Sequence, residues 1–298
     1  MSMDIALIGG AGYVGSNLVK DLVDRFGIIV IDRYNSGKTN SIRFIQADAS
    51  VKDLTDIMSS CEAVIHLASE SDVRKVGSDN HIDLDITSNI VDCSISAGLR
   101  KVMYFSSSAV YGDNGWGADE QTICEPISQY GLIKLESERL LSSSKLESIV
   151  LRPSNICGRS VTHGVVFDFV NQLTVHSDHM DILGNGLQTK EFVHVSDVID
   201  FVKICLDSWI SGTYNISNGD PLSISDLAGI VVESMSLNDV KINVGKGDRG
   251  WKGDVSRCHL ICDRALSIGW SPKYSSKRSV EDAVMCMISG DGGPVNVY

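Results

Sequence analysis

A tyrosine and a lysine stand four residues apart in the run Tyr130-Gly131-Leu132-Ile133-Lys134. On a helix this spacing places both side chains on one face, one above the other. A neighbouring ammonium stabilises phenolate and lowers the pKa of a tyrosine from its ordinary value of about 10. A phenol with a lowered pKa can act as a general base on an alcohol or sugar hydroxyl. Since the same spacing arises by chance on exposed helices, its meaning depends on the motifs around it.

Three glycines, Gly9, Gly12 and Gly15, form the pattern Gly-x-x-Gly-x-x-Gly between an expected strand and an expected helix. A dinucleotide site needs such glycines, because the loop turns tightly, its backbone approaches the pyrophosphate, and the helix packs closely on the strand. The helix N-terminus offers free N–H groups and a positive dipole end to the phosphates. An ordinary glycine-rich turn is the alternative, and the acid that ends the next strand argues against it.

That acid is Asp32, seventeen residues after Gly15. A carboxylate at this position accepts both ribose hydroxyls of the adenosine and repels a 2′-phosphate, which favours NAD over NADP. Arg33 is able to bind such a phosphate, but Asp32 holds the strand-end position and weighs more. Asp48 follows the third expected strand and is a candidate acceptor for the adenine amino group, with an ordinary turn aspartate as the alternative.

Runs of apolar, β-branched residues alternate with longer amphipathic stretches through the first half of the chain. The expected strands are Asp4–Gly9, Ile28–Asp32, Ile42–Ile45, Ala63–Leu67, Lys101–Ser106 and Ser148–Arg152. The expected helices are Gly15–Phe26, Ile82–Ala97 and Ser128–Ser142. Strands that are apolar throughout are buried on both faces of a sheet. The sequence therefore predicts an α/β fold with a Rossmann-type doubly wound parallel sheet.

After about residue 158 the pattern becomes irregular, with more glycines, histidines and short segments. Later expected elements are the helices 196–209, 223–236, 263–269 and 277–287 and the strands 212–216 and 241–244. We expect an NAD-binding Rossmann domain over residues 1–158, to which residues 193–218 return. Residues 159–192 and 219–298 are expected to form a smaller mixed α/β substrate-binding lobe. Because ligands commonly bind in clefts between lobes, the site is expected there.

The composition excludes several classes of partner. The 298-residue chain carries a net charge of −12, which argues against a nucleic-acid partner and against attraction to anionic lipid. No apolar run approaches the roughly 18 residues that span a bilayer, and the N-terminus lacks the basic region of a secretory signal. A cytoplasmic protein without a membrane partner is therefore expected.

The eight cysteines form no Cys-x-x-Cys pair, and several lie in apolar runs, which indicates free thiols in a reducing compartment. Cys258 and His259 with Cys262 fit no usual zinc spacing. His176 and His179, beside two aspartates, are interpreted as part of a solvated loop. No metal site is expected.

Three serines, Ser106, Ser107 and Ser108, follow the fifth expected strand, where open α/β sheets bind ligands. They begin the run Ser-Ser-Ser-Ala-Val-Tyr-Gly, which ends at Gly112. The glycine loop, the strand-end aspartate, this run and Tyr-x-x-x-Lys, in this order, resemble the extended short-chain dehydrogenase/reductase family. The resemblance is closest to its NAD-dependent sugar epimerase/dehydratase branch.

The resemblance spans roughly residues 4 to 285. Residues 152–158 are similar to the family's Arg-x-x-Asn-x-x-Gly segment, and residues 184–198 to its Gly-x-Gly…Phe-Val-His-Val-x-Asp-Val segment. Tyr214-Asn215 and Gly253-Asp254 also fit the family pattern.

The resemblance implies roles for individual residues. Ser107 would hydrogen-bond the reacting sugar oxygen, Tyr130 would be the base and acid, and Lys134 would bind the nicotinamide ribose. The implied NAD contacts are Gly9, Gly12, Tyr13, Val14, Gly15, Asp32, Asn35, Ser36, Asp48, Ala49, Leu67, Ala68, Tyr130, Lys134 and Pro153. The implied substrate contacts are Ser107, Ser108, Tyr130, Asn155, Lys190, Arg249, Asp254 and Cys258, with Ser108 as the alternative catalytic hydroxyl.

The residues at the serine position bear on the reaction. Dehydratases of the branch typically carry Thr-Asp-Glu there, because elimination needs a further acid and base. Here Ser107-Ser108-Ala109 stand in their place, without a carboxylate. The resemblance therefore implies epimerisation of a UDP-hexose at C4, as in UDP-glucose 4-epimerase. Two further functions stay open: an oxidoreductase that releases NADH after net oxidation or reduction of a nucleotide sugar or small alcohol, and an NAD-binding sensor without turnover.

Three positions depart from the family pattern. Lys190 stands where relatives usually have an arginine that contacts the pyrophosphate; it keeps the charge but loses the bidentate fork, and Arg249 is a candidate for the other cation. Cys258 stands where 4-epimerases have a bulky tyrosine, which implies room for a 2-acetamido group. Asp83 stands where the family often has an asparagine that contacts the cofactor.

Relatives commonly pair through two helices of the cofactor domain. The corresponding helices here are Ile82–Ala97 and Ser128–Ser142, so the resemblance implies a symmetric homodimer.

Overall fold

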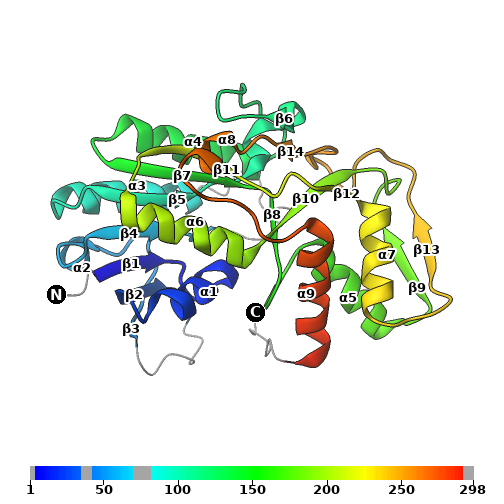
Figure 1. Cartoon of the computed structure of the whole chain (residues 1–298). Coiled ribbons are helices and arrows are strands. Elements are labelled where there is room, and N and C mark those ends of the chain that lie inside the picture. The colour runs from blue at the N-terminus through cyan, green and yellow to red at the C-terminus, as the bar shows by residue number, and fades with distance from the viewer. Residues whose placement is uncertain (1–3, 35–41, 70–81, 291–298) are drawn as a thin grey trace. The chain divides into compact units, whose positions relative to one another are not determined.

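The largest sheet of the protein has seven strands, in a computed structural model that describes residues 4–34, 42–69 and 82–290. From one edge to the other the order is β11, β7, β5, β4, β1, β2, β3 (Figure 1). The bounds are β1 Asp4–Ile8, β2 Gly27–Asp32, β3 Arg43–Gln46, β4 Ala63–His66, β5 Lys101–Phe105, β7 Glu147–Pro153 and β11 Gly212–Ile216. Each predicted strand of this sheet lies within one residue of the observed strand at either end. The predicted doubly wound α/β fold is confirmed.

Strand β1 lies at the point where the strand order changes direction. It pairs in parallel with β2 on one side and with β4 on the other. Its residues Ile5, Ala6, Leu7 and Ile8 are fully buried, as expected for a strand with both faces covered. In open α/β sheets, ligands bind beyond the carboxyl ends of the strands at this switch point. The glycine loop follows β1 and therefore occupies the expected ligand-binding position.

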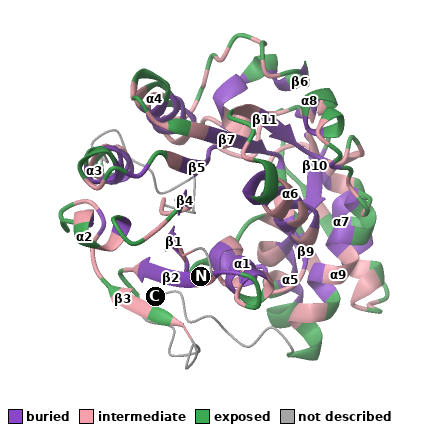
Figure 2. Ribbon diagram, turned by 60° about the vertical axis from the view of Figure 1, so that its left-hand side comes forward, coloured by how far each residue is buried: buried purple, intermediate pink, exposed green. Residues whose placement is uncertain are grey.

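Helices α2, α3 and α4 pack on this sheet through apolar side chains. The helices in this part of the fold have the bounds α1 Tyr13–Leu22, α2 Thr55–Met58, α3 Ile82–Ser96, α4 Gln129–Ser143 and α6 Val195–Ser208. Met58 of α2 and Ile86 and Ile90 of α3 belong to one buried cluster with Val64 of β4 and Val102 of β5. Figure 2 shows the strands mainly in purple and exposed residues in green on helices such as α4.

Smaller sheets and further helices make up the other described elements. The sheets have the orders β12-β10-β8, β13-β9 and β14-β6. The strands are β6 Trp116–Ala118, β8 Asn155–Cys157, β9 His179–Ile182, β10 Thr189–His194, β12 Pro221–Ser223, β13 Lys241–Val244 and β14 His259–Leu260. The helices are α5 Val165–Val175, α7 Ile224–Ser234, α8 Asp263–Ser267 and α9 Ser276–Ser289, with 3-10 turns η1 Ser108–Tyr111 and η2 Asp113–Gly115.

The region expected to be irregular contains regular elements. Helix α5 buries Val166, Phe169, Val170 and Leu173, which have helical spacing, so the signal was present in the sequence. His179 begins strand β9, so the expectation of a solvated loop at this residue was wrong. The predicted start of α7 is confirmed.

The chain divides into two compact units. One comprises residues 1–107, 132–152 and 205–214, and the other comprises residues 108–131, 153–204 and 215–298. The domain boundaries expected from the sequence stay a prediction. Among the described residues, no helix is both long enough and apolar enough to cross a membrane.

A buried ion pair fixes helix α4 to the sheet. Glu138 of α4 accepts hydrogen bonds from Nε and Nη2 of Arg152 on β7, at 3.0 and 2.6 Å. The Ser106 hydroxyl donates to the same carboxylate. Both charged side chains are only 8% exposed. Because burial of a charge is tolerated only with a partner, this pair sets where α4 lies on the sheet.

We predict that Glu138→Gln costs about 3–5 kcal/mol of unfolding free energy, because it removes the buried carboxylate charge that accepts from Nε and Nη2 of Arg152. Glu136→Gln is the matched control on the same helix, since Glu136 pairs with Arg139 at the exposed surface. The control is expected to change stability by less than about 0.5 kcal/mol. Urea unfolding of both variants measures the difference. Equal midpoints would show that the buried pair does not anchor the helix.

Candidate functional site

Two of the loop glycines are required by the protein's own packing. Gly9 has φ +83°, and a Cβ there would lie 2.6 Å from the Ala68 nitrogen and 3.0 Å from the Leu67 carbonyl carbon. A Cβ on Gly15 would lie 2.6 Å from Gly10 Cα. Side chains do not approach backbone this closely, so both positions exclude a larger residue.

Gly12 is different, because the described residues leave room for a side chain there. Its φ is −70°, and a Cβ would meet the Gly9 carbonyl oxygen at an ordinary 3.4 Å. Gly12 is exposed and caps helix α1, whose first turn begins at the buried Tyr13 and the half-buried Val14 and has no acidic residue. The N–H groups and positive dipole end of this turn suit a pyrophosphate. The loop therefore fits a dinucleotide.

Asp32 lies beside the glycine loop. Its Oδ2 accepts from the Ala11 backbone N–H at 3.0 Å, and its Oδ1 accepts from the Tyr34 N–H at 3.1 Å. These two bonds orient the carboxylate at the end of β2. Since each oxygen has a further lone pair, the group can still accept from ribose hydroxyls.

Asp48 is held in a local turn. Its Oδ1 accepts from the Ser50 backbone N–H at 2.9 Å and from the Ser50 hydroxyl at 2.7 Å. These bonds, the hydroxyl first, hold the pKa of Asp48 below its usual value. The turn explains this aspartate without a ligand, so its contact with adenine stays a prediction. The neighbouring Ala49 is buried. Asn35 and Ser36 lie outside the described residues.

Lys134 is buried below the surface of helix α4. Its side-chain nitrogen donates to the Phe105 carbonyl oxygen at 2.9 Å, and the residue is 3% exposed. Burial lowers the pKa of Lys134 to about 8, while the carboxylates of Asp83 and Glu138 act in the opposite direction. With this pKa the ammonium is still the main form at neutral pH. Tyr130 lies one helical turn earlier on α4, which confirms the predicted helical spacing of the two residues.

His66 is a residue that the sequence reading missed. It ends β4, is 1% exposed, and bonds Thr87 Oγ1 through Nε2 at 3.0 Å. Burial, and secondarily the charge of Lys134, lowers the pKa of His66 to about 3, so the ring is neutral. Its Nδ1 finds no hydrogen-bond partner among the described residues. The sequence feature that could have identified His66 is a single histidine at the carboxyl end of an apolar strand.

The remaining catalytic candidates lie at ends of elements. Ser107 follows β5 directly, and Ser108 opens the turn η1. Ser107, Ser108 and Tyr130 are all half-buried, whereas Pro153, the last residue of β7, is buried.

Three of the predicted substrate contacts converge. The Lys190 ammonium donates to Asp254 Oδ1 at 2.8 Å and to the Val255 carbonyl oxygen. Arg249 Nη1 donates to the Asp254 carbonyl oxygen at 2.5 Å. Nη2 of the same guanidinium bonds both carboxylate oxygens of Asp113, at 3.0 and 2.9 Å. The structure therefore brings Lys190, Arg249 and Asp254 together and adds an aspartate that the sequence did not indicate.

Cys258 lies next to this group along the chain. Its thiol hydrogen-bonds Ser108, and burial raises its pKa to about 11, so the thiol stays protonated. Its backbone N–H donates to the Thr189 carbonyl oxygen at 2.9 Å. The segment that carries Cys258 therefore runs beside strand β10.

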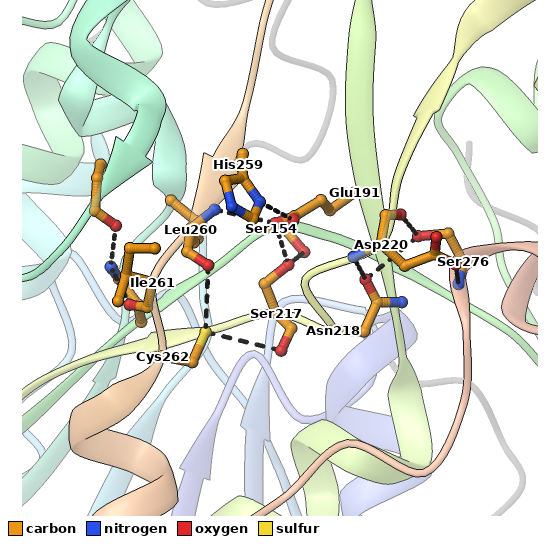
Figure 3. Close-up of polar contacts among 12 residues, drawn as sticks. Ser154, Glu191, Ser217, Asn218, Asp220, His259, Leu260, Ile261, Cys262 and Ser276 are labelled. Atoms are coloured by element: carbon orange, nitrogen blue, oxygen red, sulfur yellow. Dashed lines mark hydrogen bonds and ion pairs between the residues drawn. The ribbon is translucent and has the colours of Figure 1, made fainter.

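A buried carboxylate secures this arrangement. Glu191 accepts from Ser217 Oγ at 2.5 Å, from the Leu260 N–H at 3.1 Å and bonds His259 Nδ1 at 2.6 Å (Figure 3). Asn155 is exposed, and its side-chain amide donates to the Glu191 carbonyl oxygen at 3.1 Å. Glu191 thus links the strand that carries Lys190 to both Asn155 and the segment of Cys258. Its role depends on partners distant in sequence, so no local pattern indicated it.

Comparison with known proteins identifies the family. The pattern of the NAD dependent epimerase/dehydratase family matches residues 5–217. A putative UDP-glucose 4-epimerase of Methanocaldococcus jannaschii is 30% identical, over 95% of this chain and 98% of that protein. A dTDP-D-glucose 4,6-dehydratase of Mus musculus is 23% identical, over 94% of this chain and 87% of that protein. A structure of UDP-glucose 4-epimerase from Thermotoga maritima with UDP-glucose has a TM-score of 0.84 at 25% identity, over 96% of this chain and 99% of that chain.

The family match covers more than half of the chain, and the archaeal relative covers nearly all of it. Relatives with both an epimerase and a dehydratase name occur, so the reaction is a separate question. The glycine loop and the strand-end aspartate fit the cofactor for which the family is named. This chain belongs to the NAD-dependent epimerase/dehydratase family and is an NAD-dependent enzyme.

Proposed function

We propose that the enzyme epimerises a nucleotide sugar at C4, with a UDP-hexose as substrate. The observation that carries the proposal is the buried Lys134, fixed to the Phe105 carbonyl oxygen on the helix that presents Tyr130 one turn earlier. A charged lysine there favours ionisation of the phenol. The archaeal relative named as a putative UDP-glucose 4-epimerase supports this reaction.

Each of these residues has a separate role in the proposed reaction. Bound NAD would supply reversible hydride transfer at C4 of the sugar, with no net oxidation. Tyr130 takes the proton of the C4 hydroxyl and gives it back after the 4-keto sugar has turned. Ser107, with Ser108 as the alternative, donates a hydrogen bond to the reacting oxygen. Lys134 keeps its charge beside the phenolate and binds the nicotinamide ribose.

The residues after β5 favour epimerisation over dehydration. Ser107, Ser108 and Ala109 supply no carboxylate, whereas elimination of water needs a further acid and base. A serine and tyrosine pair suffices for reversible oxidation. Net oxidation or reduction with release of NADH is the remaining alternative.

The cluster of Lys190, Arg249 and Asp254 supports a nucleoside-diphosphate substrate. Arginine and lysine are the side chains that bind phosphate, arginine as a planar fork and lysine as a point charge. The exposed Asn155 lies on the strand next to the one that carries Lys190 and is assigned to the same substrate.

The small Cys258 side chain supports a second substrate class. A bulky residue at this position would narrow the sugar pocket, whereas a thiol leaves space for a 2-acetamido group. UDP-N-acetylhexosamines are therefore included among the proposed substrates.

The proposal extends to the cofactor contacts and the assembly. Gly12, Val14, Asp32 and the other implied residues of the glycine loop and its neighbouring strand ends are assigned to NAD. A cytoplasmic homodimer that pairs through α3 and α4 is also proposed. The exposed Ile95 of α3 and Leu132 of α4 support pairing through these helices.

The cofactor role of Gly12 predicts a loss of binding without a loss of fold. Gly12→Ala is expected to weaken NAD binding at least about tenfold, because its Cβ takes the place of the pyrophosphate, and to change unfolding free energy by about 1 kcal/mol or less. Gly15→Ala is the contrasting variant, in which the Cβ clash destabilises the protein itself. Calorimetric NAD titration and thermal melts measure the two effects. Wild-type NAD affinity in Gly12→Ala would contradict the assignment.

Tyr130→Phe is expected to lower turnover by about 10²-fold or more, because the general base is lost, while NAD stays bound. A panel of UDP-, GDP- and dTDP-sugars with product identification measures turnover, and UDP-galactose is the expected product from UDP-glucose. Stoichiometric accumulation of absorbance near 340 nm would instead indicate net oxidation. Unchanged turnover in the variant would exclude Tyr130 as the base.

The proposed pocket predicts opposite responses to two changes of Cys258. Cys258→Tyr is expected to abolish turnover of UDP-N-acetylglucosamine and to retain turnover of UDP-glucose. Cys258→Ser keeps the side-chain volume and is expected to retain both activities. Initial rates with the two substrates test this, and loss of neither activity in Cys258→Tyr would count against the pocket assignment.

A further inference from the structure

The Arg249 guanidinium, assigned to a diphosphate, already binds an anion of the chain itself. Asp113 meets Nη2 with both carboxylate oxygens, at 3.0 and 2.9 Å. These bonds are the principal reason why the pKa of Arg249 is raised. Carboxylate and phosphate oxygens are both acceptors for guanidinium N–H groups. The Asp113 carboxylate therefore occupies the Nη2 side of Arg249, where a phosphate oxygen would bind.

Asp113 differs in exposure from the other acid at this cluster. The Asp254 side chain is 11% exposed and pairs with Lys190, and it also accepts from the Gly250 backbone N–H at 3.0 Å. The Asp113 side chain is 55% exposed. An exposed ion pair contributes about 1 kcal/mol or less, so it exchanges readily for a ligand of higher charge. Asp254 is thus part of the framework, and Asp113 is the group that a ligand can displace.

The turn that carries Asp113 is firmly held, so the carboxylate is presented in a defined place. Gly112, just before it, has φ +57°, and a Cβ there would lie 2.0 Å from the Glu125 carbonyl oxygen. Asn114, just after it, donates to the Ile123 carbonyl oxygen at 3.1 Å and to Glu125 Oε2 at 3.2 Å. Contacts on both sides of Asp113 fix the backbone while its own side chain remains free to turn away.

We propose that Asp113 is an internal competitor for the diphosphate site, which holds Arg249 until a nucleoside diphosphate displaces its carboxylate. This inference rests on the proposed function, because it concerns the same cation. The carboxylate weakens binding of every anion at Arg249, because each ligand must first displace it from the guanidinium.

The test is a calorimetric titration of the NAD-loaded protein with UDP. Asp113→Asn removes the charge and is expected to tighten UDP binding about two- to fivefold, as the range for exposed ion pairs allows. Asp113→Ala is a second variant with the same expectation. Asp207→Asn is the matched control, because Asp207 forms a comparably exposed ion pair with Arg25, and no change in UDP affinity is expected.

A double-mutant cycle links the effect to Arg249. Arg249→Ala is expected to weaken UDP binding about tenfold or more, and adding Asp113→Asn to it is expected to change nothing further. Unchanged or weaker UDP binding in Asp113→Asn and Asp113→Ala would overturn the inference and show that Asp113 merely positions the arginine. A tightening that persists without Arg249 would overturn it as well.

A further experiment separates a failure of this inference from a failure of the proposed function. If UDP does not bind wild-type protein, the proposed substrate class is wrong, and inorganic pyrophosphate replaces UDP as the probe. Tighter pyrophosphate binding in Asp113→Asn and weaker binding in Arg249→Ala, each relative to wild type, would then support the role of Asp113 as a competitor. Absence of pyrophosphate binding, or an unchanged affinity in Asp113→Asn, would overturn it.

Discussion

A buried ammonium is the constraint on which the position of helix α4 depends. Removing a charge from water costs several kcal/mol unless partners replace the solvent. Lys134 has the Phe105 carbonyl oxygen as a direct acceptor and the carboxylates of Asp83 and Glu138 as favourable charges. Glu138 in turn neutralises the buried Arg152. Within the part of the chain that the structure describes, these two cations lie close to these two carboxylates, and their attraction helps to set where helix α4 lies. Its first turn, with Tyr130, is positioned as a consequence.

In the compact unit of residues 108–131, 153–204 and 215–298, carboxylates also hold cations, but the two ion pairs differ in burial. Lys190 and Asp254 form a largely buried pair, whereas Arg249 and Asp113 form a pair that solvent reaches. In a protein with a net charge of −12, an anionic ligand enters against an adverse field. Cations held in place by acids of the chain are preorganised, so a ligand that replaces one acid need not order the cation as well. The buried pair supplies rigidity, and the exposed pair supplies the exchangeable position.

The elements that carry the glycine loop and the Tyr130–Lys134 pair could be predicted from local sequence patterns. Contacts between distant segments could not. The loop from Gly9 to Gly15 and the spacing of Tyr130 and Lys134 are short-range features, and the structure has them where the sequence placed them. The pairing of Arg249 with Asp113 joins residues 136 positions apart, and no periodicity encodes it. No sequence pattern singled out Glu191, because its bonds come from segments 26 and 68 residues away. Helix α5 was missed for another reason: glycines and histidines around it obscured its apolar spacing.

Asp83 shows how a departure from the family pattern can follow from the same charge balance. An asparagine at this position would remove one of the two carboxylates whose charges raise the pKa of Lys134. The pKa of Lys134 is already lowered to about 8 by burial, and the Asp83 charge opposes that effect. Asp83 also lies in the first turn of α3, where the helix dipole favours a negative charge. Without this carboxylate the pKa of the lysine would be lower still, and less of the ammonium proposed to favour a phenolate at Tyr130 would be present at neutral pH.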